Sequence, residues 1–177
     1  MKKEIEVKVK VDRFDICMSL LEKEGCTFSD PIEQDDMVFV NYDGDYLQFP
    51  HGANYLRIRK TKDGAFFTLK RGSEMDSIER ETSISNPEEM RDALLFMGYH
   101  EVVQVRKIRT KTKYKQYEVC LDDVEGLGKF IELEKISDED SALVQQELLD
   151  LLKSWGVEIK ERVLNGYDTL MYIQHHK

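Results

Sequence analysis

Two short stretches of alternating sequence decide the fold that we expect for this chain. Near its start the chain reads Glu4-Ile5-Glu6-Val7-Lys8, and much later it reads Phe130-Ile131-Glu132-Leu133-Glu134. The alternation of charged and apolar residues has a period of two, which is the side-chain period of a β-strand. Each stretch therefore predicts a strand with one charged face and one apolar face. If the two strands face each other, their paired carboxylates could bind a hard divalent cation.

Charged faces recur on the strands predicted between these two. They are formed by Arg57 and Arg59, Thr68 and Lys70, Glu79 and Glu81, Lys107 and Arg109, and Glu118, Cys120 and Asp122. A half-buried antiparallel strand also turns a polar face to water, which is the simpler explanation for any single strand. That explanation predicts assorted polar residues, whereas these faces are mostly charged and tend to one sign per strand. From the pattern alone, a solvent-facing surface and a charged interior both remain open.

The order of the expected elements indicates an antiparallel sheet and an α+β class. Strands are expected at 3–11, 35–41, 55–61, 66–70, 77–85, 101–110, 114–122 and 129–136, mostly joined as hairpins. Helices are expected at 12–25, 87–98 and 138–155, followed by a short strand and a helical turn around 167–173. An eight-stranded barrel is just wide enough to hold one small ligand. We find no second domain and expect residues 1–177 to form one domain.

The composition indicates a globular protein without a membrane segment. Charged residues make up 34% of the 177 and apolar residues 41%, with a net charge of −9. No basic stripe or tail is present, which argues against a nucleic-acid partner. No apolar run reaches membrane-spanning length, and the start shows no signal-peptide pattern. The three cysteines lack metal-like spacing, so we expect reduced thiols in a cytoplasmic protein.

If the charged faces line an interior, their residue types favour a metal and a polyanion. Mg²⁺ and Mn²⁺ prefer carboxylate oxygens and usually share their coordination with substrate phosphates. Arginine offers a planar fork that matches phosphate oxygens, and lysine offers a mobile point charge. Six basic residues would neutralise an oligophosphate: Lys8, Arg57, Arg59, Lys70, Lys107 and Arg109.

The charged motifs occur in an order that resembles a known family. The opening Glu4-x-Glu6-x-Lys8 looks like the ExExK signature of the CYTH family, also called triphosphate tunnel metalloenzymes. The resemblance covers nearly the whole chain and continues through the stretches 56–59, 68–70, 79–81, 105–109 and 121–134. It implies an eight-stranded antiparallel β-barrel that forms a tunnel, with helices packed outside. It also implies dependence on Mg²⁺ or Mn²⁺ and a small-molecule triphosphate substrate such as ATP or tripolyphosphate.

The resemblance also implies roles for particular residues, matched position by position. The implied metal ligands are Glu4, Glu6, Glu132 and Glu134, with Asp122 and Glu81 assisting. The implied phosphate-binding residues are Lys8, Arg57, Arg59, Lys70, Lys107 and Arg109. The motifs identify neither a general base nor an oligomeric state.

Within the family, the stretches 105–109 and 122–134 look closest to class IV adenylyl cyclases. This likeness implies cyclisation of ATP to cyclic AMP and pyrophosphate. The chain departs from the family pattern at Gly166-Tyr167, where a Ser-Tyr pair is common, and in the loop 42–53, which lacks family signatures. The alternatives are an inorganic tripolyphosphatase, a thiamine or nucleoside triphosphatase, and a non-catalytic module that binds oligophosphates or nucleotides.

Overall fold

The structure is a computed structural model that describes residues 2–50, 52–73 and 75–176. Its strands are β1 (Lys3–Val11), β2 (Ile32–Val40), β3 (Asn54–Thr61), β4 (Gly64–Ser73), β5 (Asp76–Ile84), β6 (His100–Tyr114), β7 (Tyr117–Val124), β8 (Gly128–Ser137) and β9 (Glu161–Val163). Its helices are α1 (Asp15–Lys23), η1 (Tyr46–Gln48), α2 (Pro87–Phe96), α3 (Ser141–Ser154) and α4 (Tyr167–His175). The predicted antiparallel α+β arrangement is confirmed, with every described strand pair antiparallel.

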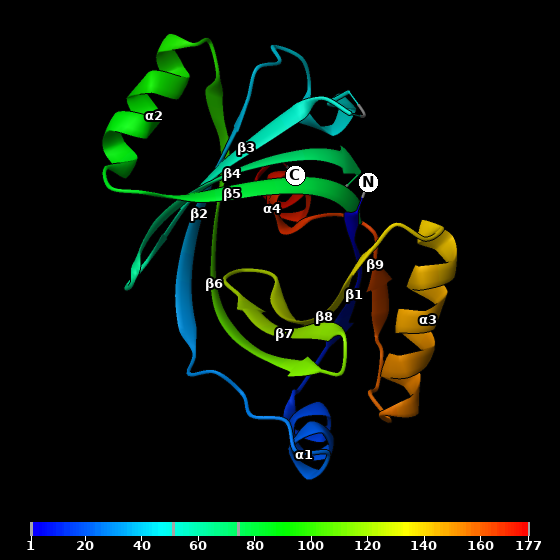
Figure 1. Cartoon of the computed structure of the whole chain (residues 1–177). Helices are drawn as coiled ribbons and strands as arrows, with labels where there is room; N and C mark the ends of the chain where they lie inside the picture. The colour runs from blue at the N-terminus through cyan, green and yellow to red at the C-terminus, as the bar shows by residue number, and fades with distance from the viewer. Residues whose placement is uncertain (1, 51, 74, 177) are drawn as a thin grey trace.

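Eight of the strands follow one another around a ring, which Figure 1 views along its opening. The ring runs β1, β5, β4, β3, β2, β6, β7, β8 and back to β1. It differs from the expected barrel at one seam, because β1 pairs with β5 only through Glu4 with Ser77 and Ile5 with Asp76. Farther along the same edge, Lys8 to Lys10 pair instead with β9. The short ninth strand therefore takes backbone groups that a fully closed barrel would give to β5.

The alternation in β1 places its apolar side chains outside the ring. Ile5, Val7 and Val9 are at most 1% exposed and pack with apolar residues of β7, β8, α1 and α3. On the opposite side of the ring, α2 contributes Leu94 to a second cluster against Phe39 and Leu56. Burial of these side chains supplies the main driving force for folding. The apolar core thus lies between the ring and its outer helices, which leaves the charged faces to the interior.

The last helix corrects the expectation that all helices pack outside. Tyr167 and Met171 of α4 are buried against Val103, Val105 and Phe130, and Figure 1 shows α4 through the opening of the ring. The inward-facing side chains at the end of the ring that contacts α4 are apolar, so they are stabilised when other apolar side chains pack against them. Helix α4 supplies such side chains and brings Tyr167 and Asp168 to the interior.

The helix starts agree with the sequence only in part. Asn86 caps α2 as its position predicted, since its side chain accepts from the Glu89 N–H at 3.1 Å. Helix α3 is capped by Asp140, a few residues later than expected. The first helix is expected from residue 12, but α1 begins at Asp15, and Asp12 pairs with Lys160. No helix within the described ranges is long and apolar enough to span a membrane.

Candidate functional site

The interior of the ring contains a cavity of about 580 Å³. Of the twelve site residues implied by the sequence, eleven line it: Glu4, Glu6, Lys8, Arg57, Arg59, Lys70, Glu81, Lys107, Arg109, Glu132 and Glu134. Asp122 does not line this cavity. The charged faces therefore line an interior cavity, although the Glu81 side chain is also 44% exposed.

Three carboxylates converge at one part of the cavity. Ligand oxygens of Glu4, Glu6 and Glu134 all lie within 4.8 Å of one another, and Glu6 lies directly opposite Glu134 in the pairing of β1 with β8. We call these three residues the acidic trio. Burial raises the pKa of Glu4 and Glu6, and burial followed by the Glu4 charge raises the pKa of Glu134 to about 8. A divalent cation would relieve the repulsion and fits this all-oxygen donor set.

Glu132 lies beside the acidic trio but is held by cations. Lys8 Nζ lies 3.2 Å from one of its carboxylate oxygens, and Arg109 binds the other. Burial opposes ionisation here, yet Lys8 and Arg109 hold the pKa of Glu132 well below its usual range. Glu132 is therefore a charged carboxylate paired with two basic residues, whereas Glu6 and Glu134 each have one longer ion pair, to Lys8 at 3.6 Å and to Arg109 at 3.9 Å.

Asp122 is placed behind the cavity wall, where it orients basic residues. It is fully buried and accepts from Arg109 Nε at 2.7 Å and from Arg109 Nη2 at 2.5 Å. The Tyr167 hydroxyl donates to it at 2.9 Å, and Lys107 Nζ lies 3.5 Å away. With these donors the carboxylate is largely saturated. Glu81 is similarly engaged, accepting from Thr68 at 2.8 Å and from Arg57 at 3.4 Å.

Asp36 is a site residue that the sequence reasoning missed. It is 4% exposed and lines the cavity. Its two carboxylate oxygens accept hydrogen bonds from Arg59 Nε and Nη2, both at 2.7 Å. Arg59 and Arg57 hold the pKa of Asp36 well below its usual range despite its burial. A signal was present, because Asp36 occupies the inward position of β2 opposite Arg59. The pairing of β2 with β3 was needed to interpret it.

Arg57 has hydrogen-bonding capacity left over. Its side chain is 12% exposed, and its Nη2 contacts Thr68 at 3.2 Å and Glu81 at 3.4 Å. The buried Nε has no hydrogen-bond partner among the described residues. A buried donor without a partner is costly, and it marks a point where a ligand acceptor would be stabilising.

Tyr167 supports two lysines on the floor of the cavity. Lys8 Nζ lies 4.2 Å and Lys107 Nζ 4.7 Å from the centre of its ring, both within cation–π range. Burial and the neighbouring Arg109 lower the pKa of Lys107 to about 8. A bound phosphate would raise the pKa of Lys107 again and so favour its charged form.

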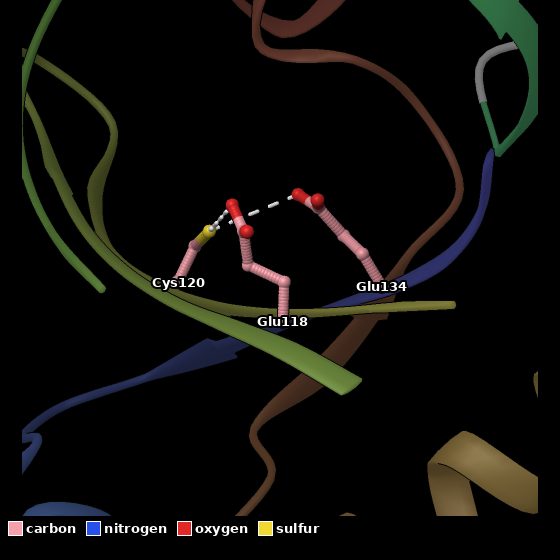
Figure 2. A group of neighbouring side chains, drawn as sticks. All are labelled: Glu118, Cys120 and Glu134. Carbon is pink, nitrogen blue, oxygen red and sulfur yellow. Dashed lines mark hydrogen bonds between the residues drawn. The ribbon is translucent and has the colours of Figure 1, made fainter. Parts of the chain in front are cut away.

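A second cluster shares Glu134 with the acidic trio. Figure 2 shows Glu118 and Cys120 of β7 beside Glu134 of β8, with the Cys120 Sγ 3.9 Å from Glu118 and 3.8 Å from Glu134. Ligand atoms of all three lie within 4.8 Å of one another. Lys111 pairs with Glu118 at 3.1 Å and also lines the cavity.

We expect the metal-free protein to lose stability as the pH rises from about 4.5 to about 8. The folded state keeps a proton on Glu134 up to about pH 8, whereas the ordinary value is 4.5. Over this interval the folded state binds more protons than the unfolded state, so the free energy of unfolding falls with pH. Thermal unfolding in EDTA across this range measures the slope.

Glu134→Gln should flatten that slope, because glutamine does not ionise. Glu33→Gln, an exposed position on β2, should retain the wild-type slope. Added Mg²⁺ should restore stability at the higher pH by binding the ionised trio. Equal slopes for wild type and Glu134→Gln would contradict the assignment of the pH effect to Glu134.

The chain matches a family model and a full-length relative. Residues 2–167 match the CYTH domain family. A protein of Methanocaldococcus jannaschii, MJ0240, which bears the provisional name adenylate cyclase, is 34% identical over 173 residues. The alignment covers 93% of this chain and 95% of that relative. Both comparisons extend across the ring and the carboxylate-bearing strands.

Solved structures show the same fold. The PH1819 protein of Pyrococcus horikoshii is 26% identical, with a TM-score of 0.76, and the match covers 98% of this chain and 99% of that one. HpAC1 from Hippeastrum, provisionally called an adenylyl cyclase and described as having a dominant triphosphatase activity, is 18% identical with a TM-score of 0.63. That match covers 100% of this chain and 97% of HpAC1. From the family match across residues 2–167, the chain belongs to the CYTH domain family.

Proposed function

We propose that this chain is a divalent-metal-dependent enzyme that acts on a triphosphate. The observation that carries the proposal is the presence of the acidic trio and six basic side chains around one cavity. A module that only binds oligophosphates needs the basic residues but gains nothing from three converging carboxylates, which repel the ligand. The trio therefore favours an enzyme over a non-catalytic binding module.

The acidic trio is the part of the cavity suited to hold Mg²⁺ or Mn²⁺. Glu132 adjoins it, and since each of its oxygens contacts one basic residue, it would share any metal coordination with Lys8 or Arg109. We assign Asp122 and Glu81 to orienting basic side chains, because their oxygens already accept from Arg109, Arg57 or neighbouring hydroxyls. A bound metal ion would polarise the phosphoryl group that reacts and neutralise developing charge.

The basic residues would bind and orient the triphosphate. Arg57 offers its unpartnered Nε, while Asp36 and Asp122 fix the forks of Arg59 and Arg109. Fixed donors aimed at a phosphoryl group stabilise the transition state because they need little reorganisation. Lys8, Lys70 and Lys107 add mobile positive charge around the same cavity.

The first candidate reaction is cyclisation of ATP to cyclic AMP and pyrophosphate. The ribose 3′ oxygen would attack the α-phosphorus in line with the departing pyrophosphate. The name of the 34% identical relative supports this choice. The second candidate is hydrolysis of tripolyphosphate or of a thiamine or nucleoside triphosphate, which the activity described for HpAC1 supports. Both reactions require the same metal and the same basic residues.

Product analysis is expected to show metal-dependent turnover of ATP to cyclic AMP with an equal amount of pyrophosphate. The purified protein is incubated with ATP or tripolyphosphate, in Mg²⁺, in Mn²⁺ and in EDTA. Chromatography then resolves cyclic AMP, pyrophosphate, ADP and orthophosphate. Orthophosphate without cyclic AMP, with faster turnover of tripolyphosphate, would replace the cyclase by the hydrolase. Tight binding without any product would support the non-catalytic module.

A further inference from the structure

Gln34 carries a buried amide oxygen without a partner among the residues that the structure describes. The residue is 9% exposed and lines the cavity. Its Oε1 atom is buried and accepts no hydrogen bond from the described part of the chain. Buried polar groups in proteins are nearly always hydrogen-bonded, because an unpaired one lowers stability. A glutamine with a purely structural role would have a partner, so the unpaired oxygen indicates a role toward a ligand.

Strand pairing places this amide among the residues that we assign to phosphate binding. Gln34 and Asp36 are two residues apart on β2 and both line the cavity, so their side chains share its inner face. Asp36 in turn holds Arg59 through two hydrogen bonds. Gln34 lies directly opposite Lys107 of β6, and opposite side chains on one face of an antiparallel pair are close neighbours.

The basic neighbours of Gln34 do not supply the missing donor. Lys107 Nζ lies 3.5 Å from Asp122 and 4.7 Å from the centre of the Tyr167 ring. Arg59 donates from its Nε and one Nη to Asp36. Both basic groups are thus directed at a carboxylate or an aromatic ring, while the Gln34 oxygen stays unpaired.

The ligand group that pairs with an amide oxygen must carry a proton. The oxygens of an ionised triphosphate carry none, so they would contact the lysines and arginines instead. The oxygen that attacks the phosphorus does carry one, as the ribose hydroxyl in cyclisation or as water in hydrolysis. The last torsion of a glutamine is broad, so the amide can turn its oxygen toward this group. A glutamine orients the attacking water in this way in GTP-hydrolysing enzymes.

We infer that the Gln34 amide holds the hydroxyl group or water molecule that attacks the phosphorus. The inference rests on the proposed function and assigns a residue to the attacking group. In the step, a bond forms between the attacking oxygen and phosphorus while the bridging P–O bond to the departing phosphate chain breaks. An amide is not a base at neutral pH, so the proton of the attacking group passes to an oxygen of the departing chain. Gln34 thus orients the nucleophile and does not take its proton.

Gln34→Met tests this role, because methionine has a similar length and volume but no amide. Gln146→Met is the matched control, since Gln146 is exposed on α3 and does not line the cavity. Turnover is measured at saturating ATP and at saturating tripolyphosphate with Mg²⁺. Calorimetry in EDTA gives the affinity for tripolyphosphate without turnover, and thermal unfolding in EDTA gives the stability.

Gln34→Met should lower turnover at saturation by about a hundredfold, because a misplaced nucleophile reacts that much more slowly. Its tripolyphosphate affinity should match the wild type, since phosphate oxygens do not donate to an amide oxygen. Its thermal stability should equal or exceed the wild type, because the change removes an unpaired polar group. Gln146→Met should match the wild type in turnover and affinity. A loss of cyclic AMP would identify the ribose hydroxyl as the group held, and a loss of orthophosphate would identify water.

Gln34→Asn keeps the amide but withdraws it by one methylene group, so it should also lose turnover at unchanged affinity. Unchanged turnover in both Gln34 variants, with an active wild type, would overturn the inference and leave the proposed function intact. A loss of tripolyphosphate affinity or of thermal stability as large as the loss of turnover would also overturn it, because Gln34 would then support the basic residues. If the wild type turns over neither substrate with metal, the inference fails together with the proposed function.

Discussion

Glu6→Gln is expected to lower metal-dependent turnover by about a hundredfold or more. Glu6 is 7% exposed and shares the acidic trio with Glu4 and Glu134. The substitution removes one anionic oxygen of the proposed metal site with little change in volume, and a metal ion at a phosphoryl group supplies several kcal/mol of stabilisation. A loss of about 2.7 kcal/mol corresponds to a hundredfold in rate. Initial rates over a Mg²⁺ titration measure both turnover and metal affinity.

The same substitution should not unfold the protein. Because burial raises the pKa of Glu6, the neutral side chain suits the metal-free cavity at least as well as the ionised one. Thermal unfolding in EDTA should therefore match or exceed the wild type. Glu134→Gln should behave alike, whereas the exposed Glu33→Gln should leave activity unchanged. Normal turnover with normal metal affinity in Glu6→Gln would refute the ligand assignment.

Arg57→Ala is expected to weaken tripolyphosphate binding by more than tenfold. Its guanidinium lines the cavity, and its buried Nε lacks a partner within the described part of the chain. A hydrogen bond to a charged group contributes about 1.5–3 kcal/mol, which corresponds to roughly tenfold to a hundredfold in affinity. Calorimetric titration with tripolyphosphate, in EDTA and in Mg²⁺, measures the loss.

Arg106→Ala provides the control for this charge change. Arg106 lies on β6 with its side chain 56% exposed and does not line the cavity. Its removal lowers the net charge equally but should change tripolyphosphate affinity little. Arg57 is a better position to test than Arg59. Arg59→Ala would also remove the two hydrogen bonds that Arg59 donates to the buried Asp36, which would leave a buried carboxylate poorly paired. Equal affinities for Arg57→Ala and wild type would place Arg57 outside the binding site.

The sequence by itself determined which side chains share a face of each strand. Successive side chains of a strand point to opposite sides, so the alternation in residues 4–8 separates Glu4 and Glu6 from Ile5 and Val7 whatever the rest of the chain does. The same local rule grouped Arg57 with Arg59 on β3. Eleven of the twelve residues implied by the family resemblance line one cavity. The alternation alone grouped them by face and left open whether those faces point to solvent or to an interior.

Only the tertiary structure decided which of these charges meet. The pairing of β1 with β8 sets Glu6 opposite Glu134 and Lys8 opposite Glu132. A shift of two residues would keep every side chain on the same face while exchanging these partners, so the alternation cannot select between the registers. Register therefore separates the acidic trio from Glu132, which pairs with two basic residues.

The position of α4 was likewise beyond the sequence pattern. Its amphipathic character predicts an apolar contact but does not say whether the helix lies outside or inside the ring. Inward-facing Val103, Val105 and Phe130 supply the apolar surface that draws it into one end. That placement brings Tyr167 beneath the two lysines and joins η1 to Asp168. The local sequence determines which charged side chains share a face of a strand. Their partners depend on contacts between segments far apart in the chain.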